Sequence, residues 1–262
     1  MNLLHAAVLG AVEGLTEFLP VSSTAHLTLA SRAMGLSKEE TDAFNVIIQA
    51  GAVLAIVSHY KLLLTSTAKG LFAGEPRARV LPLHLLLAFV PTAVVGLLGR
   101  HWMRTHLNAP VPIAIAWITG GALMLLWPGR TETVRPLNAS SALGLGLAQA
   151  ASIWPGISRS MASIYGGMAA GLGRREAAEF SFLLGLPTLG AAALYEAYKA
   201  RHDFGYVVPW SCLLIGFIVS YAVARAVVGP LLRYVASHDF RAFGWYRIVF
   251  GIALYALTRN AA

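Results

Sequence analysis

The sequence predicts an all-α integral membrane protein, and three observations lead to this fold class. Hydrophobic residues make up 57% of the 262 residues and charged residues only 12%, with a mean hydropathy of +0.64. A soluble domain carries about 25% charged residues. The apolar residues gather in runs long enough to cross about 30 Å of hydrocarbon as helices, and the chain consists of two similar halves.

Charge and cysteine content exclude other classes of protein. The formal net charge is +8, but the Lys and Arg residues are scattered through short loops, so we expect no nucleic-acid partner. In a membrane protein, loop arginines set the orientation and meet anionic lipid headgroups.

The single cysteine, Cys212, lies in an apolar run, which excludes an internal disulfide and a thiolate metal cluster. We expect it to pack inside a helix.

The N-terminal apolar stretch is expected to belong to the mature fold. It has no basic start, and Glu13 and Glu17 interrupt it, unlike a cleavable signal peptide. Farther along, six apolar runs have the length of a membrane-spanning helix, about 20 residues. These runs cover residues 44–60, 82–99, 110–127, 180–198, 208–228 and 243–258. We therefore expect six transmembrane helices in a single membrane domain.

The chain repeats itself at a constant offset of 136 positions. MGLSKEETDAF at 34–44 falls on AGLGRREAAEF at 170–180, and the same offset holds without a gap over about fifty residues. One offset kept over this length predicts an internal duplication. Repeat one covers about 1–130 and repeat two about 137–262.

Each repeat begins with an apolar segment that a proline breaks at its centre. The segments are 3–34, broken at LPVSS, and 141–171, broken at WPGIS. A segment that enters and leaves by the same face adds no crossing, so each repeat crosses three times and the second repeat is inverted. Two such re-entrant hairpins in an inverted repeat predict one polar site near the bilayer midplane.

Loop charge predicts the orientation. Ten Lys and Arg residues fall in the loops of one face and seven on the other face. The positive-inside rule places the richer face in the cytoplasm and both termini outside. The loops of the richer face are 61–81, 128–140, 172–179 and 229–242.

The first break lies in EGLTEFLPVSSTAH, which begins with two carboxylates. Glu13 and Glu17 are four residues apart, so both lie on one face of a helix. One interpretation is a pair exposed to the headgroups. The other is a metal or proton site, since ionisable residues in apolar segments are usually functional.

Three hydroxyls and a histidine follow the proline in this motif. Ser22, Ser23 and Thr24 can cap the next helix, but capping needs only one hydroxyl. With His26 close by, the group is typical of a nucleophile, its neighbours and a general acid or base. A histidine held by packing alone is the alternative.

The second break, PGISRS, has the composition of an anion site. Gly156 lets the backbone approach a ligand closely, and Ser158 is a good N-cap for a helix whose first N–H groups attract anions. Arg159 adds a fork that matches phosphate oxygens, and Ser160 and Ser163 add hydroxyls. An ion pair between the arginine and a glutamate of the first motif is the alternative. A phosphate ester or anhydride bound here would be hydrolysed by in-line attack.

These motifs resemble those of a known family, the undecaprenyl-diphosphate phosphatases, also called bacitracin-resistance proteins. The resemblance extends to FNVIIQAG at 44–51 and EFSFLLGLP at 179–187 and covers nearly the whole chain. It implies hydrolysis of undecaprenyl diphosphate to undecaprenyl phosphate and inorganic phosphate, which recycles the lipid carrier of peptidoglycan synthesis. It also implies a place in the bacterial inner membrane, a site open to the periplasm and a divalent cation, Mg²⁺ or Ca²⁺.

The resemblance also implies roles for individual residues. Glu13 and Glu17 would hold the metal or move protons, and Arg159 would clamp the diphosphate. Ser23 would be the candidate nucleophile and His26 its proton-transfer partner. Whether Ser23 or an activated water attacks stays open, and a homodimer is compatible with this interpretation.

Two other functions compete with the phosphatase. A polyprenyl-phosphate transporter or flippase would also use inverted repeats, broken helices and an anion site. It would need the arginine and the helix ends but no nucleophile with a proton partner. A structural membrane scaffold leaves the ionisable residues of the apolar segments unexplained.

Overall fold

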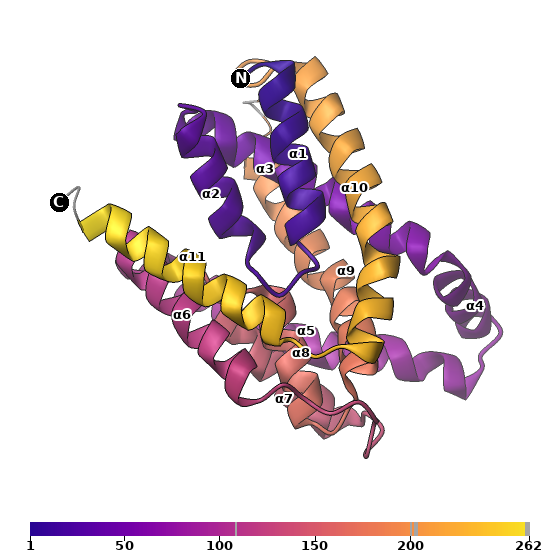
Figure 1. The fold of residues 1–262 in the computed structure, drawn as a ribbon. Coiled ribbons are helices and arrows are strands. Elements are labelled where there is room, and N and C mark those ends of the chain that lie inside the picture. The colour runs from indigo at the N-terminus through magenta and orange to yellow at the C-terminus, as the bar shows by residue number, and fades with distance from the viewer. Residues whose placement is uncertain (108, 200, 202–203, 260–262) are drawn as a thin grey trace. The chain divides into compact units, whose positions relative to one another are not determined.

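The computed structural model describes residues 1–107, 109–199, 201 and 204–259. Within these ranges the regular structure is helical, with eleven α-helices and two short 3-10 helices (Figure 1). This confirms the all-α class. The helices are α1 Leu3–Thr16, α2 Ser23–Ala33, α3 Lys38–His59, α4 Lys61–Phe72, η1 Pro76–Arg79, α5 Val80–His106, α6 Pro110–Leu126, α7 Ala139–Ala150, η2 Ala151–Ile153, α8 Arg159–Ala169, α9 Arg174–Lys199, α10 Trp210–Ser237 and α11 Arg241–Arg259.

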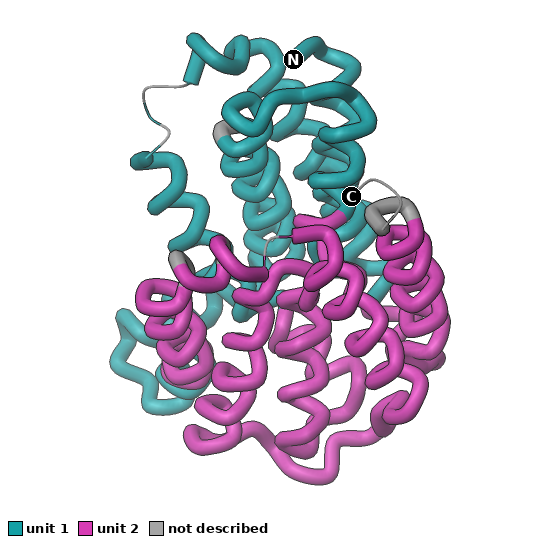
Figure 2. The backbone as a smooth tube through the Cα atoms, turned by 90° about the vertical axis from the view of Figure 1, so that its left-hand side faces the viewer, with its two compact units in different colours: residues 1–18, 26–82, 182–231 teal, residues 19–25, 83–181, 232–262 magenta. Residues whose placement is uncertain are grey.

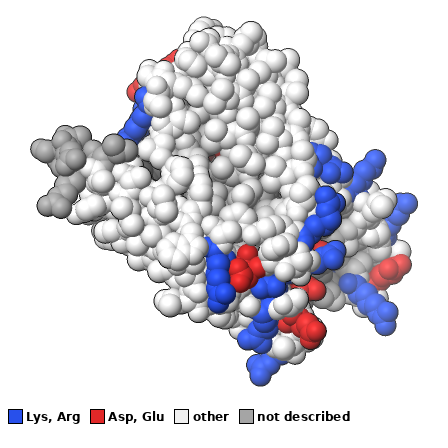
Figure 3. Space-filling model, in the orientation of Figure 1, with Lys and Arg blue, Asp and Glu red and all other residues white. Residues whose placement is uncertain are grey.

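Four helices are long and apolar enough to cross a membrane. They span Lys38–His59, Pro76–Gly99, Arg174–Lys199 and Trp210–Ser237. The two other predicted spans form α6, with 17 residues, and α11, with 19 residues. Large apolar side chains are exposed on many helices, and much of the surface in Figure 3 carries no charged side chain. These features are those of a multi-pass membrane protein, and the count of six spans stays a prediction.

The two broken segments have the local structure that their prolines predict. In the first, α1 ends at Thr16 and α2 begins at Ser23, and Pro20 lies in the turn between them. In the second, α7 and η2 end at Ile153 and α8 begins at Arg159. Proline lacks the N–H that a continuous helix needs, so both helices stop before it.

Three pairs of helices begin at positions 136 apart. The starting residues are 3 and 139 for α1 and α7, 23 and 159 for α2 and α8, and 38 and 174 for α3 and α9. The first pair also shares its N-cap, because Asn2 accepts from the N–H of His5 and Asn138 accepts from the N–H of Ser141. Equivalent local sequences therefore begin helices at equivalent points.

The chain folds into two compact units, and each contains segments from both halves of the sequence (Figure 2). Unit 1 holds α1, α3 and α4, with most of α2, α9 and α10. Unit 2 holds α6, α7, α8 and α11, with most of α5 and the turn that precedes α2. The ranges are 1–18, 26–82 and 182–231 for unit 1, and 19–25, 83–181 and 232–262 for unit 2.

In unit 1, glycines let helices approach closely. A Cβ atom at Gly10 of α1 would lie 2.6 Å from the carbonyl oxygen of Gly216 in α10, and one at Gly51 of α3 would lie 2.7 Å from that of Phe217. Small residues at such contacts are typical of membrane helix packing. Ser220 adds a hydrogen bond from its Oγ to the carbonyl oxygen of Ile48, at 2.6 Å. The helices α1 and α10 lie side by side in Figure 1.

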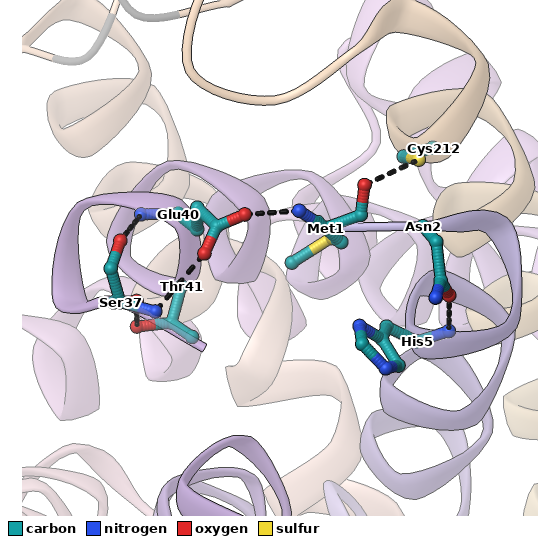
Figure 4. Close-up of polar contacts among 7 residues, drawn as sticks. All are labelled: Met1, Asn2, His5, Ser37, Glu40, Thr41 and Cys212. Atoms are coloured by element: carbon teal, nitrogen blue, oxygen red, sulfur yellow. Dashed lines mark hydrogen bonds and ion pairs between the residues drawn. The ribbon is translucent and has the colours of Figure 1, made fainter. Parts of the chain in front are cut away.

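Cys212 packs inside unit 1, as the sequence predicts. It is 2% exposed and belongs to an apolar cluster with Leu9, Phe44 and Ile48. Its Sγ faces the carbonyl oxygen of Met1, and the amino group of Met1 forms an ion pair with Glu40 (Figure 4).

In unit 2, α6 and α11 form a close pair (Figure 1). A Cβ atom at Gly121 would lie 2.6 Å from the carbonyl oxygen of Gly244, so the backbones meet without side chains between them. A second close pair joins α7 to α5, where a Cβ atom at Gly146 would collide with the carbonyl group of Ala88. The close approach of the backbones in both pairs therefore depends on glycine.

Candidate functional site

The two carboxylates of the first motif belong to unit 1. Glu13 lies in the last turn of α1 and Glu17 caps its end, where the N–H of Glu17 donates to the carbonyl oxygen of Glu13 at 2.9 Å. Their side chains are 2% and 5% exposed. This burial argues against a pair exposed to lipid headgroups. A buried pair of like charges requires a compensating cation or proton.

The hydroxyl residues of the first motif lie where α2 begins. Ser22 and Ser23 are buried, Thr24 is exposed and His26 is half-buried. Ser23 is the first residue of α2, and His26 follows three residues later in the same helix, a spacing that makes neighbours on one face. Ser23 and His26 therefore share one side of α2, and their roles as nucleophile and proton-transfer partner stay predictions.

The turn before α2 has unusual backbone geometry. Ser22 has φ = 71°, the one positive φ among the non-glycine residues that the structure describes. This left-handed conformation costs energy for an L-residue with a Cβ atom. Such strain persists only where the surroundings over-determine the backbone, and it concentrates at functional sites.

The second motif forms a capped helix start in unit 2, as predicted. Ser158 is the N-cap of α8, and its Oγ accepts from the N–H of Met161 at 3.3 Å. Arg159 is the first helical residue, and its Nη1 donates to the carbonyl oxygen of Ser181 in α9 at 3.0 Å. The positive end of the α8 dipole and a guanidinium therefore coincide, which favours an anion.

The two proline turns meet within unit 2. The Oγ of Ser160 donates to the carbonyl oxygen of Leu19 at 2.8 Å, and the Oγ of Ser158 lies 2.8 Å from that of Ser160. Leu19 belongs to the first motif and the serines to the second. The structure thus brings Leu19 next to Ser158 and Ser160, although more than 130 residues separate them.

Two further residues of the second motif have their partners inside the protein. Ser163 is fully buried, and its Oγ lies 2.6 Å from that of Ser181 and 2.8 Å from the carbonyl oxygen of Arg159, to which it donates. Gly156 has φ = 97°, and a Cβ atom there would lie 2.9 Å from the carbonyl oxygen of Ile113 in α6. In this structure Ser163 links α8 to α9 and Gly156 packs against α6, and the contact of both residues with substrate stays a prediction.

Arg247 in α11 also belongs to this region, and it is not among the candidate residues predicted from the sequence. It is fully buried, and its guanidinium donates to the carbonyl oxygens of Pro20 and Gly156, one in each proline turn. A signal was available, because Arg247 interrupts the apolar run 243–258. An ionisable residue in such a run indicates function by default.

The donor set allows a divalent cation that shares its ligands with a substrate. No group of three or more His, Cys, Asp or Glu side chains suited to a metal occurs among the residues that the structure describes. Glu13 and Glu17 offer two buried carboxylates. Mg²⁺ is commonly held by one or two carboxylates together with substrate phosphates and water, so this pair fits such a cation.

Comparison with known proteins gives a family match over most of the chain. The family model described as "Bacitracin resistance protein BacA" matches residues 6–253. The chain is 43% identical over 261 residues to "Undecaprenyl-diphosphatase 2" of Rhodospirillum rubrum, covering 97% of this chain and 94% of that protein. It is 44% identical over 262 residues to "Undecaprenyl-diphosphatase" of Dechloromonas aromatica, again covering 97% and 94%.

Proposed function

Because this chain belongs to the bacitracin resistance protein BacA family, we propose that it is a membrane phosphatase that hydrolyses undecaprenyl diphosphate. The products are undecaprenyl phosphate and inorganic phosphate, so the enzyme returns the lipid carrier to peptidoglycan synthesis and thereby confers bacitracin resistance. The observation that carries the proposal is the meeting of the two proline turns in unit 2. There Leu19, four residues before Ser23 in the chain, accepts a hydrogen bond from Ser160 in the first turn of α8.

Arg159 and the first turn of α8 would bind the diphosphate. Hydrogen bonds between a guanidinium and phosphate oxygens are charge-assisted and often bidentate, and the helix N-terminus adds free N–H donors. Gly156, Ser158, Ser160 and Ser163 would shape the site through their backbone and hydroxyl groups. Phosphoryl transfer depends mainly on such positioning and charge stabilisation.

The chemical step is in-line attack on the terminal phosphorus. The P–O bond to the bridging oxygen breaks, and undecaprenyl phosphate leaves with the bond electrons. If Ser23 attacks, His26 accepts the hydroxyl proton and water later hydrolyses the phosphoserine. If water attacks directly, His26 takes the proton of that water, and Ser22, Ser23 and Thr24 orient the phosphate.

Glu13 and Glu17 would hold Mg²⁺ or Ca²⁺. A bound cation neutralises phosphate charge, which lowers the barrier to attack by an anionic or polar nucleophile. Glu17, nearer to the hydroxyl motif in the chain, would also move protons. The support for this role is the burial of both carboxylates.

The topology that we propose is an inverted repeat of six spanning helices and two re-entrant hairpins, with repeats at about 1–130 and 137–262. Its support is the offset of 136 residues between the starts of three helix pairs. The chain would lie in the bacterial inner membrane with the site open to the periplasm. The excess of Lys and Arg in the loops assigned to the cytoplasm supports this orientation.

Phosphate release by the purified protein tests the proposed function. Detergent-solubilised protein with undecaprenyl diphosphate should release inorganic phosphate in Mg²⁺ or Ca²⁺, and EDTA should abolish the release.

Ser23→Ala should lower turnover by more than about 100-fold if Ser23 attacks, whereas a severalfold loss would favour water. Ser66→Ala, an exposed change in α4, is the matched control.

Failure of this assay would favour the transporter. Folded protein that releases no phosphate with any divalent cation would contradict a phosphatase. Reconstituted vesicles would then be tested for movement of a labelled polyprenyl phosphate between leaflets, which needs the anion site but no nucleophile.

A further inference from the structure

Arg247 is a buried cation whose hydrogen bonds, within the part of the chain that the structure describes, end on backbone carbonyl groups. Its Nη1 donates to Pro20 at 3.1 Å, and its Nη2 donates to Ala116 at 2.9 Å and to Gly156 at 3.0 Å. Its Nε lies 3.4 Å from the carbonyl oxygen of Trp117. The side chain is fully buried, and all five residues belong to unit 2.

Burying a charged side chain is unfavourable, so the hydrogen bonds of Arg247 are needed to keep it inside the protein. Removing a guanidinium from water costs several kcal/mol unless hydrogen bonds replace the lost hydration. The planar fork presents five donors in a fixed geometry, and four carbonyl oxygens of three separate segments receive them. A lysine has one donor atom and could not reach all of these segments at once.

The two proline turns are the segments that most need such support. Arg247 binds the carbonyl oxygen of Pro20, two residues before Ser22 with φ = 71°. It also binds the carbonyl oxygen of Gly156, whose own φ is 97°. A carbonyl held in place fixes the orientation of its whole planar peptide unit, so one side chain restrains a peptide unit in each turn.

The neighbouring helix leaves space for the guanidinium. A Cβ atom at Gly120 of α6 would lie 2.5 Å from Nη2 of Arg247 and 2.9 Å from its Cζ. A Cβ atom at this position would therefore force the guanidinium to shift. The fork therefore depends on Gly120 as well as on its own acceptors.

We propose that Arg247 is a positioning residue of the active site, which locks the turn before Ser23 and the turn before Arg159 into one geometry. It acts through backbone carbonyl groups and does not contact the substrate. This proposal rests on the proposed function for its effect on turnover. Its structural part, the coupling of the two turns, stands on the four hydrogen bonds alone.

Steady-state kinetics test the effect on turnover. Arg247→Lys keeps the charge but loses the fork, so kcat per folded molecule should fall at least tenfold, since misplacement by about 1 Å costs up to about 100-fold. KM should change by less than about threefold because no substrate contact is lost. Arg225→Lys, at an exposed position of α10, should leave both constants unchanged. An Arg247→Lys enzyme with wild-type kcat per folded molecule would overturn the proposal.

A substitution of Gly120 tests the proposal if Arg247→Lys fails to fold. Gly120→Ala retains the arginine but pushes its fork out of place, so kcat should fall in the same way. Gly144→Ala is the matched control, because a Cβ atom there meets no atom within 4 Å. Equal kcat values for the two variants would contradict a role for the fork.

A distance measurement tests the coupling without relying on activity. Spin labels at Thr24→Cys and Ala151→Cys, both exposed in unit 2, are placed in a Cys212→Ser background. With Arg247 present the labels should give one narrow distance distribution, and Arg247→Lys should broaden it. An unchanged distance distribution would refute the coupling of the two turns. If the distribution broadens but the unmodified protein releases no phosphate from undecaprenyl diphosphate, the coupling stands and only the proposed function is refuted.

Discussion

At the scale of single residues, two positions beside the candidate site have an unusual backbone geometry. Ser22 and Gly156 both have left-handed backbone conformations, and each lies within three residues of a proposed chemical group, Ser23 or Arg159. Glycine adopts this conformation without penalty, but serine does not. The strain at Ser22 should therefore be measurable in the stability of the protein.

Two substitutions of Ser22 separate the backbone effect from the loss of its hydroxyl. Ser22→Gly and Ser22→Ala both remove the hydroxyl, but only glycine relieves the left-handed strain. We expect the glycine variant to be more stable than the alanine variant by about 1 kcal/mol, measured by thermal unfolding in detergent.

An exposed serine inside a helix supplies a control, because the expected stability difference between its glycine and alanine variants has the opposite sign. At Ser66 in α4, glycine should be less stable than alanine by about 1 kcal/mol, because glycine is the poorer helix former. The same order at both positions would show that the conformation of Ser22 carries no strain.

At the scale of elements, the helices extend beyond the apolar runs that predict them. The run 82–99 lies within α5, Val80–His106, and the run 180–198 lies within α9, Arg174–Lys199. At the C-terminal end of α5 and at both ends of α9, polar residues continue the helix because no proline or left-handed glycine stops it there. Part of the expected loop 61–81 also folds, as α4 and η1. Its leucines and lysines are good helix formers, and the apolar-run criterion does not detect a helix of 12 residues.

Close helix packing in unit 1 should be sensitive to a single methyl group. A Cβ atom at Gly51 would lie 2.7 Å from the carbonyl oxygen of Phe217, and a backbone atom cannot move aside as a side chain can. Gly51→Ala should lower stability by about 1–3 kcal/mol, seen as a lower midpoint of thermal unfolding. Gly190→Ala, where a Cβ atom meets nothing within 4 Å, should be neutral or stabilising by up to about 1 kcal/mol. Similar values for both variants would contradict the close contact of α3 with α10.

At the scale of the whole molecule, both compact units draw on both halves of the sequence. Unit 2 combines residues 19–25 and 83–181 with 232–262, so neither repeat folds as a unit of its own. The proposed inverted repeat assigns each loop to one side of the membrane, and labelling can measure this assignment. The orientation inferred from loop charge makes opposite predictions for two exposed positions.

Cysteine labelling in spheroplasts tests the proposed orientation. In a Cys212→Ser background, Tyr206→Cys should react with a membrane-impermeant maleimide from outside, since Tyr206 is 91% exposed in a loop assigned to the periplasm. Ala73→Cys, exposed at the end of α4, should react only after permeabilisation. The reverse pattern would place the richer basic face outside and contradict the assignment.

Local features of the fold follow from the sequence alone. The all-α class, the broken segments and the capped start of α8 depend on hydropathy, on Pro20 and Pro155, and on Ser158. These effects act over a few residues, because a proline removes one N–H and a serine hydroxyl satisfies one near its own position. Residue types and spacing therefore suffice to predict them.

The contacts that join the two motifs required the tertiary structure. Arg247 binds carbonyl groups of Pro20, 227 residues away, and of Gly156, 91 residues away. The acceptors are main-chain oxygens, which every residue has, so no side-chain pattern marks them in the sequence. Likewise, the partner of Ser160 is the carbonyl group of Leu19. Residue types and spacing thus suffice to predict Ser23 and Arg159 as candidates, whereas the hydrogen bonds that hold the turns before them join segments that only folding brings together.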